Sequence, residues 1–154
     1  MRNLDAMLPI AEAKLDGIIF GRVDFTLSRG LPRTAINDRQ ITDAVLEVAQ
    51  ACAANDLTLV VGGSVAVEAG PALREVRGVR LDRFETRKVI FDGGAAESPL
   101  FEAGIANAVA FELAWLENKR DHYRAIADED LARIRMIQER SGSAAPGRLA
   151  SVAA

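Results

Sequence analysis

The sequence has little of the residue types that mark several classes of protein. Cys52 is the single cysteine, so no disulfide can form within the chain, and no histidine stands at zinc-ligand spacing from it. The 154 residues carry a net charge of -3 with no basic block, and aromatic residues make up 5% of the chain. Binders of single-stranded nucleic acid interleave aromatic and basic residues. A nucleic-acid partner is therefore not expected.

Long apolar runs are missing as well. No stretch approaches the roughly 20 apolar residues that span a bilayer. The first residues also lack the apolar core of a signal peptide. We therefore expect a cytoplasmic protein with no membrane partner. The remaining composition, 49% hydrophobic and 27% charged, is that of an ordinary globular domain.

Strand-like and helix-like segments alternate along the chain, which is typical of β-α units and a parallel sheet. The expected strands are residues 18–24, residues 57–61 and at least part of 80–91. The expected helices are residues 35–55, 67–76, 100–119 and 128–140. Residues 141–154 are small, contain Gly and Pro, and are expected to be a disordered tail. The fold class is therefore α/β.

The helix expected over residues 35–55 has both a start signal and an apolar face. Asn37 can cap its first turn, and Gln40 stands three residues later, as in a capping box. An apolar stripe follows at helical spacing and consists of Ile41, Val45, Val48 and Cys52. This stripe is expected to pack on the sheet, with Cys52 as a small core residue.

Asp24 is the most informative single residue. It follows the apolar run of the first expected strand and precedes a short polar stretch with Ser28 and Gly30. Strand ends hold side chains in place while the loops after them face solvent, so a carboxylate there is a candidate ligand for a metal or substrate. An aspartate in this position is also common as a turn or helix-capping residue. The local pattern leaves both interpretations open.

The third expected strand is unusually charged. Alternation sends Phe84, Thr86 and Lys88 to one face and Glu85, Arg87 and Val89 to the other. Charges within a central strand need partners or a polar cavity, because an unpaired buried ion costs several kcal/mol. Glu85 and Arg87 are therefore expected either to form an ion pair in the sheet or to line an active site.

Four segments of the chain, taken in order, resemble one known family. They are residues 21–25 (Gly-Arg-Val-Asp-Phe) with Ser28 and Gly30, residues 61–63 (Val-Gly-Gly), residues 83–91 (Arg-Phe-Glu-Thr-Arg-Lys-Val-Ile-Phe) and residues 111–123. Together they resemble the HpcH/HpaI aldolase and citrate lyase family, from about residue 3 to about residue 140. That family folds as a β/α barrel of eight strands.

The resemblance implies that residues 1–140 correspond to the C-terminal part of such a barrel. They would form a partial TIM-type β/α barrel with parallel strands, equivalent to strands six to eight and their helices. A sheet of three strands leaves apolar surface and open edges. A homo-oligomer or a partner chain that completes the barrel is therefore expected.

The resemblance also implies site residues. Asp24 matches the aspartate that holds the family's Mg²⁺ or Mn²⁺, whereas the second protein ligand, a glutamate, is not present in the expected position before residue 3. The expected substrate-binding residues are Gly21, Arg22 and Val23 through their backbone, and Gly62 and Gly63 as a wall. The family's substrate-binding arginine and proton-transfer residue belong to earlier strands, so no catalytic residue is assigned.

Two functions follow from this comparison. The first is a metal-dependent carbon–carbon lyase or aldolase acting on a 2-oxo acid such as pyruvate, or on its aldol adduct, completed by a further N-terminal segment or a partner chain. A coenzyme A thioester is compatible with the same ancestry. The alternative is a catalytically incomplete structural or binding subunit that only oligomerises.

Overall fold

The structure is a computed structural model that describes residues 3–142, and the part of the expected tail from residue 143 onward lies outside the described residues. The chain divides into two units, Met1–Glu112 and Leu113–Ala154.

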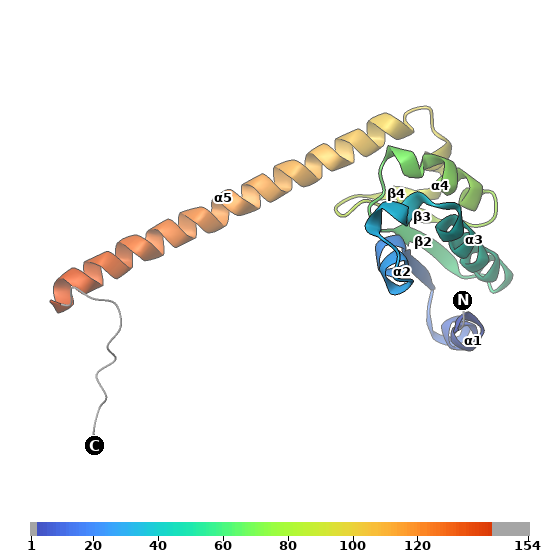
Figure 1. Ribbon diagram of the computed structural model, residues 1–154, viewed down its shortest axis with the longest axis horizontal. Helices are drawn as coiled ribbons and strands as arrows, with labels where there is room; N and C mark the ends of the chain where they lie inside the picture. The colour runs from blue at the N-terminus through green and yellow to red at the C-terminus, as the bar shows by residue number, and fades with distance from the viewer. Residues whose placement is uncertain (1–2, 143–154) are drawn as a thin grey trace, which may run out of the picture. The chain divides into compact units, whose positions relative to one another are not determined.

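A four-stranded sheet forms the centre of the first unit (Figure 1). Its strands are β1 (Gly17–Gly21), β2 (Thr58–Gly62), β3 (Arg83–Glu85) and β4 (Ile90–Asp92), in the order β1-β2-β3-β4. The first three strands are parallel, as expected, whereas β4 is antiparallel to β3. The fold is therefore mixed α/β with a mostly parallel sheet.

The third expected strand lies within residues 80–91, but it covers only Arg83–Glu85. The chain turns back after β3, and this turn is closed by hydrogen bonds between Thr86 and Val89. The Thr86 N–H donates to the Val89 carbonyl at 2.9 Å, and the Val89 N–H donates to Thr86 Oγ1 at 3.2 Å. The Thr86 hydroxyl thus accepts a hydrogen bond from the backbone on the far side of the turn. This bond stabilises the turn, so that β3 and β4 form a hairpin.

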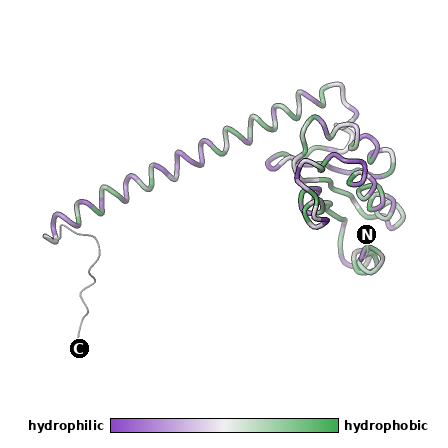
Figure 2. Tube along the Cα trace, viewed as in Figure 1, coloured by the Kyte–Doolittle hydropathy of each residue, from purple (hydrophilic) through white to green (hydrophobic). Residues whose placement is uncertain are grey.

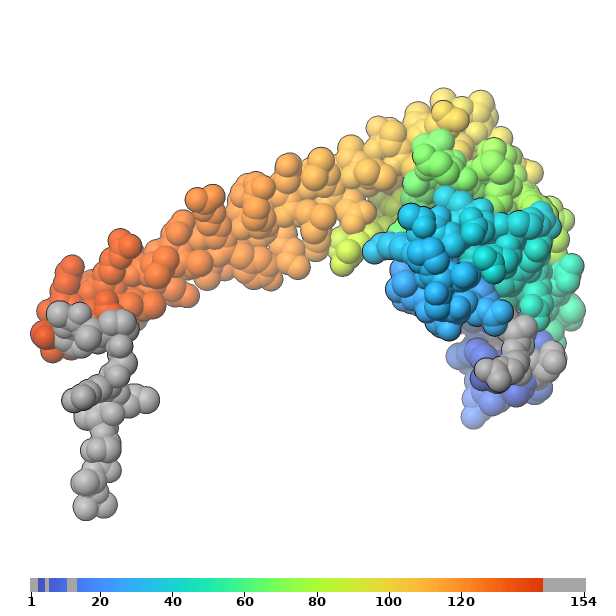
Figure 3. Space-filling model, viewed as in Figure 1, coloured from blue at the N-terminus to red at the C-terminus, as the bar shows by residue number. Residues whose placement is uncertain are grey.

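Helices precede, follow and connect the strands. The α-helices that lie wholly within this unit are α1 (Leu4–Lys14), α2 (Arg22–Ser28), α3 (Arg39–Ala54) and α4 (Gly70–Arg77), and the 3-10 helices are η1 (Arg33–Asn37), η2 (Val67–Ala69) and η3 (Gly93–Glu97). The sequence did not predict α1 or α2. Helices α2 and α3 and the short η1 between them form one continuous blue-to-cyan surface (Figure 3).

The start of the helix expected at residue 35 is also corrected. Asp38 is the N-cap of α3, and its side chain makes no capping hydrogen bond. Asn37 does not act as the expected cap, because its side-chain oxygen accepts a hydrogen bond from Arg22 at 3.0 Å. The capping-box pattern predicts that the Asn37 side-chain oxygen accepts a hydrogen bond from the first turn of the helix. In the structure this oxygen accepts from Arg22, which is distant in the sequence.

One face of the sheet carries the core. Phe20, Val61 and Phe84 lie side by side on adjacent strands and are at most 5% exposed. They share a single apolar cluster with α3, α4 and the start of α5 (Phe101–Ser141). The stripe expected on α3 is confirmed, since Ile41, Val45, Val48 and Cys52 are all buried.

The other face of the sheet is open in the described part of this unit. Ile19 pairs with Val60, and Val60 pairs with Arg83, so these three side chains share that face. Ile19 is 68% exposed, and Arg83 is exposed as well. This open face ends at the glycines where the candidate site begins.

The second unit contributes the greater part of α5, a helix of 41 residues whose first turns belong to the first unit. The expectation of two helices separated at residues 120–127 is wrong. That segment contains neither Gly nor Pro, so nothing in it breaks the helix. Apolar and polar residues alternate along its whole length (Figure 2). No helix in residues 3–142 is long and apolar enough to cross a membrane.

Candidate functional site

Two carboxylates lie over neighbouring glycines at the carboxyl ends of parallel strands. Gly21 of β1 pairs directly with Gly62 of β2. Asp24 Oδ2 lies 2.9 Å from the position that a Cβ on Gly21 would occupy, and Glu85 Oε1 lies 2.7 Å from the same position on Gly62. Adjacent strands are about 4.8 Å apart, so the two carboxylates are neighbours at one edge of the sheet.

Asp24 reaches this place in a way that differs from the expected strand end. Strand β1 ends at Gly21, which is the N-cap of α2, and Asp24 stands in the first turn of that helix. The side chain folds back over Gly21, which has no side chain to block it. An acidic residue is favourable in a first turn because backbone N–H groups give the N-terminus a partial positive charge.

The two carboxylates line a cavity of about 630 Å³, which we name the strand-end cavity. Its volume lies within the range of about 300–1,000 Å³ that is usual for small-molecule sites. The cavity carries three carboxylates and two guanidinium groups, and its charged lining residues are Asp24, Glu85, Glu112, Arg33 and Arg87. A small polar or charged ligand suits this lining better than an apolar one.

A tight turn forms one wall of the strand-end cavity. Gly63 has φ +90 and Ser64 has φ 48, both in the left-handed region. A Cβ on Gly63 would lie 2.8 Å from the backbone nitrogen of Val23, so only glycine allows the turn to approach α2 this closely. Arg33 donates a hydrogen bond to Ser64 Oγ at 3.0 Å, which orients the hydroxyl at the cavity.

The Arg22 side chain holds that turn from behind. Its guanidinium donates to Asn37 Oδ1 at 3.0 Å and to the carbonyl oxygens of Gly63 and Ser64 at 3.0 and 3.1 Å. The Arg22 residue is 3% exposed, and burial lowers its pKa to about 10. Among the residues the structure describes, its Nε has no hydrogen-bond partner.

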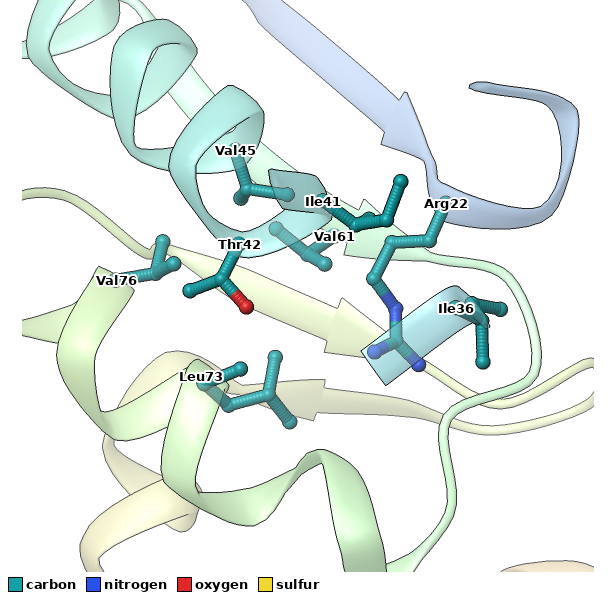
Figure 4. A pocket seen from close by; sticks show the side chains of 9 residues that line it. Arg22, Ile36, Ile41, Thr42, Val45, Val61, Leu73 and Val76 are labelled. Carbon is teal, nitrogen blue, oxygen red and sulfur yellow. The ribbon is translucent and has the colours of Figure 1, made fainter. Parts of the chain in front are cut away.

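Figure 4 shows where this guanidinium lies. It enters a space of about 10 Å³ between α3, α4 and β2, bordered mainly by apolar side chains that include Ile36, Ile41 and Leu73. This volume is at the lower limit for one water molecule. The Arg22 side chain therefore positions the 63–64 turn and does not line the strand-end cavity.

The expected site residues are thus distributed over two places. Val23, Asp24 and Gly63 line the strand-end cavity, whereas Gly21 and Gly62 lie beneath the carboxylates of Asp24 and Glu85. Both candidates of the charged strand, Glu85 and Arg87, line it as well, and no ion pair between them is present in the described part of the chain.

Sequence reasoning did not identify Arg33, Ser64 and Glu112. Ser64 directly follows two glycines, a pattern that often exposes a hydroxyl in a turn. Arg33 and Glu112 come from η1 and α5, and no local pattern marks either of them. Only the tertiary structure brings them to the cavity.

The strand-end cavity offers a cation two adjacent carboxylates, those of Asp24 and Glu85. Glu85 lies within the described residues, unlike the glutamate that the resemblance locates before residue 3. No group of three or more His, Cys, Asp or Glu side chains in residues 3–142, those of the strand-end cavity included, lies close enough together to hold a metal ion. Mg²⁺ binds oxygen ligands and commonly uses one or two carboxylates together with waters. The pair Asp24 and Glu85 fits that requirement.

Cys52 is structural. It is fully buried under the sheet, and burial raises its thiol pKa, which keeps the thiol protonated and unreactive. It therefore behaves as the small core residue that the sequence predicted.

Comparison with protein-family models, curated proteins and solved structures gives no match for this chain.

Proposed function

We propose that this chain belongs to a cytoplasmic, metal-dependent carbon–carbon lyase or aldolase of the HpcH/HpaI type, acting on a 2-oxo acid such as pyruvate or on its aldol adduct. The observation that supports it most directly is the placement of Asp24 and Glu85 over the paired residues Gly21 and Gly62. Two carboxylates at the carboxyl edge of parallel strands stand where β/α proteins carry their active sites.

Glu85 provides a second candidate metal ligand within the described residues, which the sequence did not predict. The resemblance provides one ligand, Asp24, and locates the second on a segment before residue 3. In this proposal Glu85 takes the second ligand position, and water fills the remaining positions around Mg²⁺ or Mn²⁺. The bound ion would supply positive charge beside the 2-oxo acid, where negative charge develops as the carbon–carbon bond breaks.

The other polar lining residues provide substrate contacts. Arg33 and Arg87 carry the two guanidinium groups of the cavity, and guanidinium groups bind carboxylates in a bidentate manner. Ser64 adds a hydroxyl that Arg33 already orients. The backbone of Gly21, Arg22 and Val23 remains the predicted contact for one substrate carboxylate.

The open face of the sheet supports association with additional polypeptide that would cover it. Ile19 is 68% exposed on a strand that lies at the edge of the sheet. Fully burying such a side chain contributes about 1.5–3 kcal/mol. We propose that the remaining barrel strands, supplied by another segment, a partner chain or a second copy, cover this face and carry the proton-transfer residue.

A calorimetric titration tests the proposal. The purified chain is titrated with MnCl₂ or MgCl₂ in the presence of oxalate or pyruvate. We expect binding that is lost in both Asp24→Asn and Glu85→Gln, because each variant removes one anionic ligand. Glu102→Gln is the matched control, since Glu102 is exposed in the first turn of α5 and its variant removes the same charge.

Each outcome separates the two functions considered from the sequence. Binding lost in both variants and kept in Glu102→Gln supports the lyase or aldolase. If the wild-type chain binds neither ion, or if both variants bind as it does, the metal-dependent proposal is wrong and the alternative, an incomplete structural or binding subunit, replaces it.

A further inference from the structure

The second unit presents an exposed series of side chains along α5. Within residues 113–142 the structure contains one helix, and every described side chain there is exposed except that of Gln138, which is half-buried. A series with alternating spacings of three and four residues runs along this helix. Its members, which we name the α5 seam, are Leu113, Leu116, Arg120, Tyr123, Ala127, Asp130, Ile134 and Ile137.

The spacing of the α5 seam is that of a coiled coil. Spacings of three and four residues repeat every seven, which brings all eight side chains to one face of a slightly supercoiled helix. Six of the eight are apolar, and the large ones are 43–58% exposed. Apolar faces of this kind are usually covered by another helix, since helices gain most of their stability from packing such a face.

The two charged members of the seam have opposite sign, and their positions are symmetric about its centre. We infer that the α5 seam pairs with the seam of a second copy of this chain, with the two helices antiparallel. In that register each seam residue faces a partner of matching character on the other copy. The pairs are Leu113 with Ile137, Leu116 with Ile134, Arg120 with Asp130, and Tyr123 with Ala127.

Charge selects this orientation. An antiparallel pair places Arg120 of each copy opposite Asp130 of the other, so the dimer contains two opposite-charge contacts. A parallel pair in register places Arg120 opposite Arg120 and Asp130 opposite Asp130. Like charges in a contact region oppose association strongly, and a polar residue in a coiled-coil seam typically fixes orientation and partner.

The α5 seam is complementary to a second α5 seam that runs in the opposite direction. A second copy of this chain is therefore the partner that we choose. An unrelated helix would need apolar and charged residues in this same order. The inference does not depend on the proposed function, because the seam contains no residue of the strand-end cavity.

One flanking position gives a further check. In the antiparallel register Lys119 lies beside Arg133 of the other copy, which is an unfavourable contact. Lys119 Nζ also lies 5.1 Å from the ring centre of Trp115 and 5.7 Å from that of Tyr123 within its own helix. Removing the like charge at this position should strengthen the dimer.

Sedimentation equilibrium of the full chain over a concentration series tests the inference. The wild-type chain is expected to form a dimer. Arg120→Asp should weaken it at least about tenfold, because the new carboxylate faces Asp130 of the other copy. The exchanged variant Arg120→Asp/Asp130→Arg should restore dimerisation, and Lys119→Glu should tighten it. Met136→Glu is the control, because Met136 is 50% exposed but lies outside the seam.

Orientation is tested separately by disulfide cross-linking. Leu116→Cys mixed with Ile134→Cys should give a cross-linked heterodimer, whereas neither variant alone should cross-link, and buried Cys52 stays out of reach. A wild-type chain that is monomeric at its highest soluble concentration would overturn the inference. So would an exchanged variant that fails to associate, or cross-linking of Leu116→Cys with itself.

Discussion

The carboxylate of Glu85 occupies the space in which a side chain on Gly62 would begin. Its Oε1 lies 2.7 Å from that position, and its Cγ lies 3.0 Å from it. The Glu85 side chain can therefore adopt this conformation only because residue 62 is a glycine. Gly62 has no side chain that could itself bind a ligand. The same relationship holds between Asp24 and Gly21, so the two paired glycines prepare a place for two carboxylates.

A methyl group at Gly62 should consequently remove metal binding. In Gly62→Ala the new Cβ displaces the Glu85 carboxylate, whose flexible side chain can move aside, so we expect a loss of Mn²⁺ affinity with less than about 1.5 kcal/mol of lost stability. Calorimetry and urea unfolding measure the two effects. Gly104→Ala is the control, because the nearest atom to its Cβ is 3.5 Å away. Unchanged Mn²⁺ affinity in Gly62→Ala would contradict the role of Glu85.

Two glycines with positive φ should respond differently to alanine. At Gly30, with φ +70, no atom lies within 4 Å of an added Cβ, so Gly30→Ala should cost only the backbone term of about 1–2 kcal/mol. At Gly63, with φ +90, the same change also brings a Cβ to 2.8 Å from the Val23 nitrogen. Gly63→Ala should therefore cost more. Equal losses in urea unfolding would show that the contact with α2 is unimportant.

Removing the Arg22 guanidinium should destabilise the first unit. In Arg22→Met the Asn37 side chain and the carbonyl oxygens of Gly63 and Ser64 lose a charged donor, and a hydrogen bond to a charged group contributes about 1.5–3 kcal/mol. The loss is measured by urea unfolding. Arg29→Met, an exposed arginine at the end of the same helix, should change stability by less than about 0.5 kcal/mol. A similarly small change in Arg22→Met would mean that the apolar replacement compensates for the lost hydrogen bonds.

Local patterns predicted the parts of the fold that a single amphipathic period determines. The stripe on α3 and the apolar run of β2 behave as expected because one buried face decides each of them. The end of β1 and the start of α3 were misplaced because tertiary contacts determine both. Gly21 pairs with Gly62 as the last residue of β1 and is also the N-cap of α2. The Asn37 side chain accepts a hydrogen bond from Arg22 and does not cap α3.

The candidate site shows the same division. Asp24 was identified from its place after an apolar run, and Glu85 from the charge in its strand. Their proximity depends on the pairing of Gly21 with Gly62 and on Glu85 following Phe84, which pairs with Val61. No periodicity within one segment encodes the register between strands far apart in the sequence, so the carboxylate pair appears only in the structure.

Asp82 provides a test that depends on pH. Its Oδ2 accepts hydrogen bonds from the Leu59 N–H at 2.8 Å and from Arg80 Nε at 3.0 Å. Burial opposes ionisation of this carboxyl, but the hydrogen bonds from Leu59 and Arg80, together with the charge of Arg80, outweigh it and lower its pKa. The folded state therefore binds this proton more weakly than the unfolded state does.

The sign of the pH dependence follows from that direction. The stabilisation by Asp82 is fully present above the unfolded pKa of about 3.9 and is lost as the pH falls through the lower pKa of the folded state. Asp82→Ala should cost about 1.5–3 kcal/mol at pH 7, because both hydrogen bonds involve a charged group. Urea unfolding of wild type and variant between pH 7 and pH 3 should show this difference shrinking below about pH 4.

Asp43→Ala provides the comparison for that experiment. Asp43 pairs with Arg39 at 2.7 Å on an exposed helix surface, where such pairs contribute about 0–1 kcal/mol. The Asp82 variant should therefore be clearly the less stable of the two at pH 7. If the Asp82→Ala difference stayed constant down to pH 3, the stabilisation would not come from the ionised carboxylate, and the link it makes between β2 and the residues before β3 would have to be explained by packing alone.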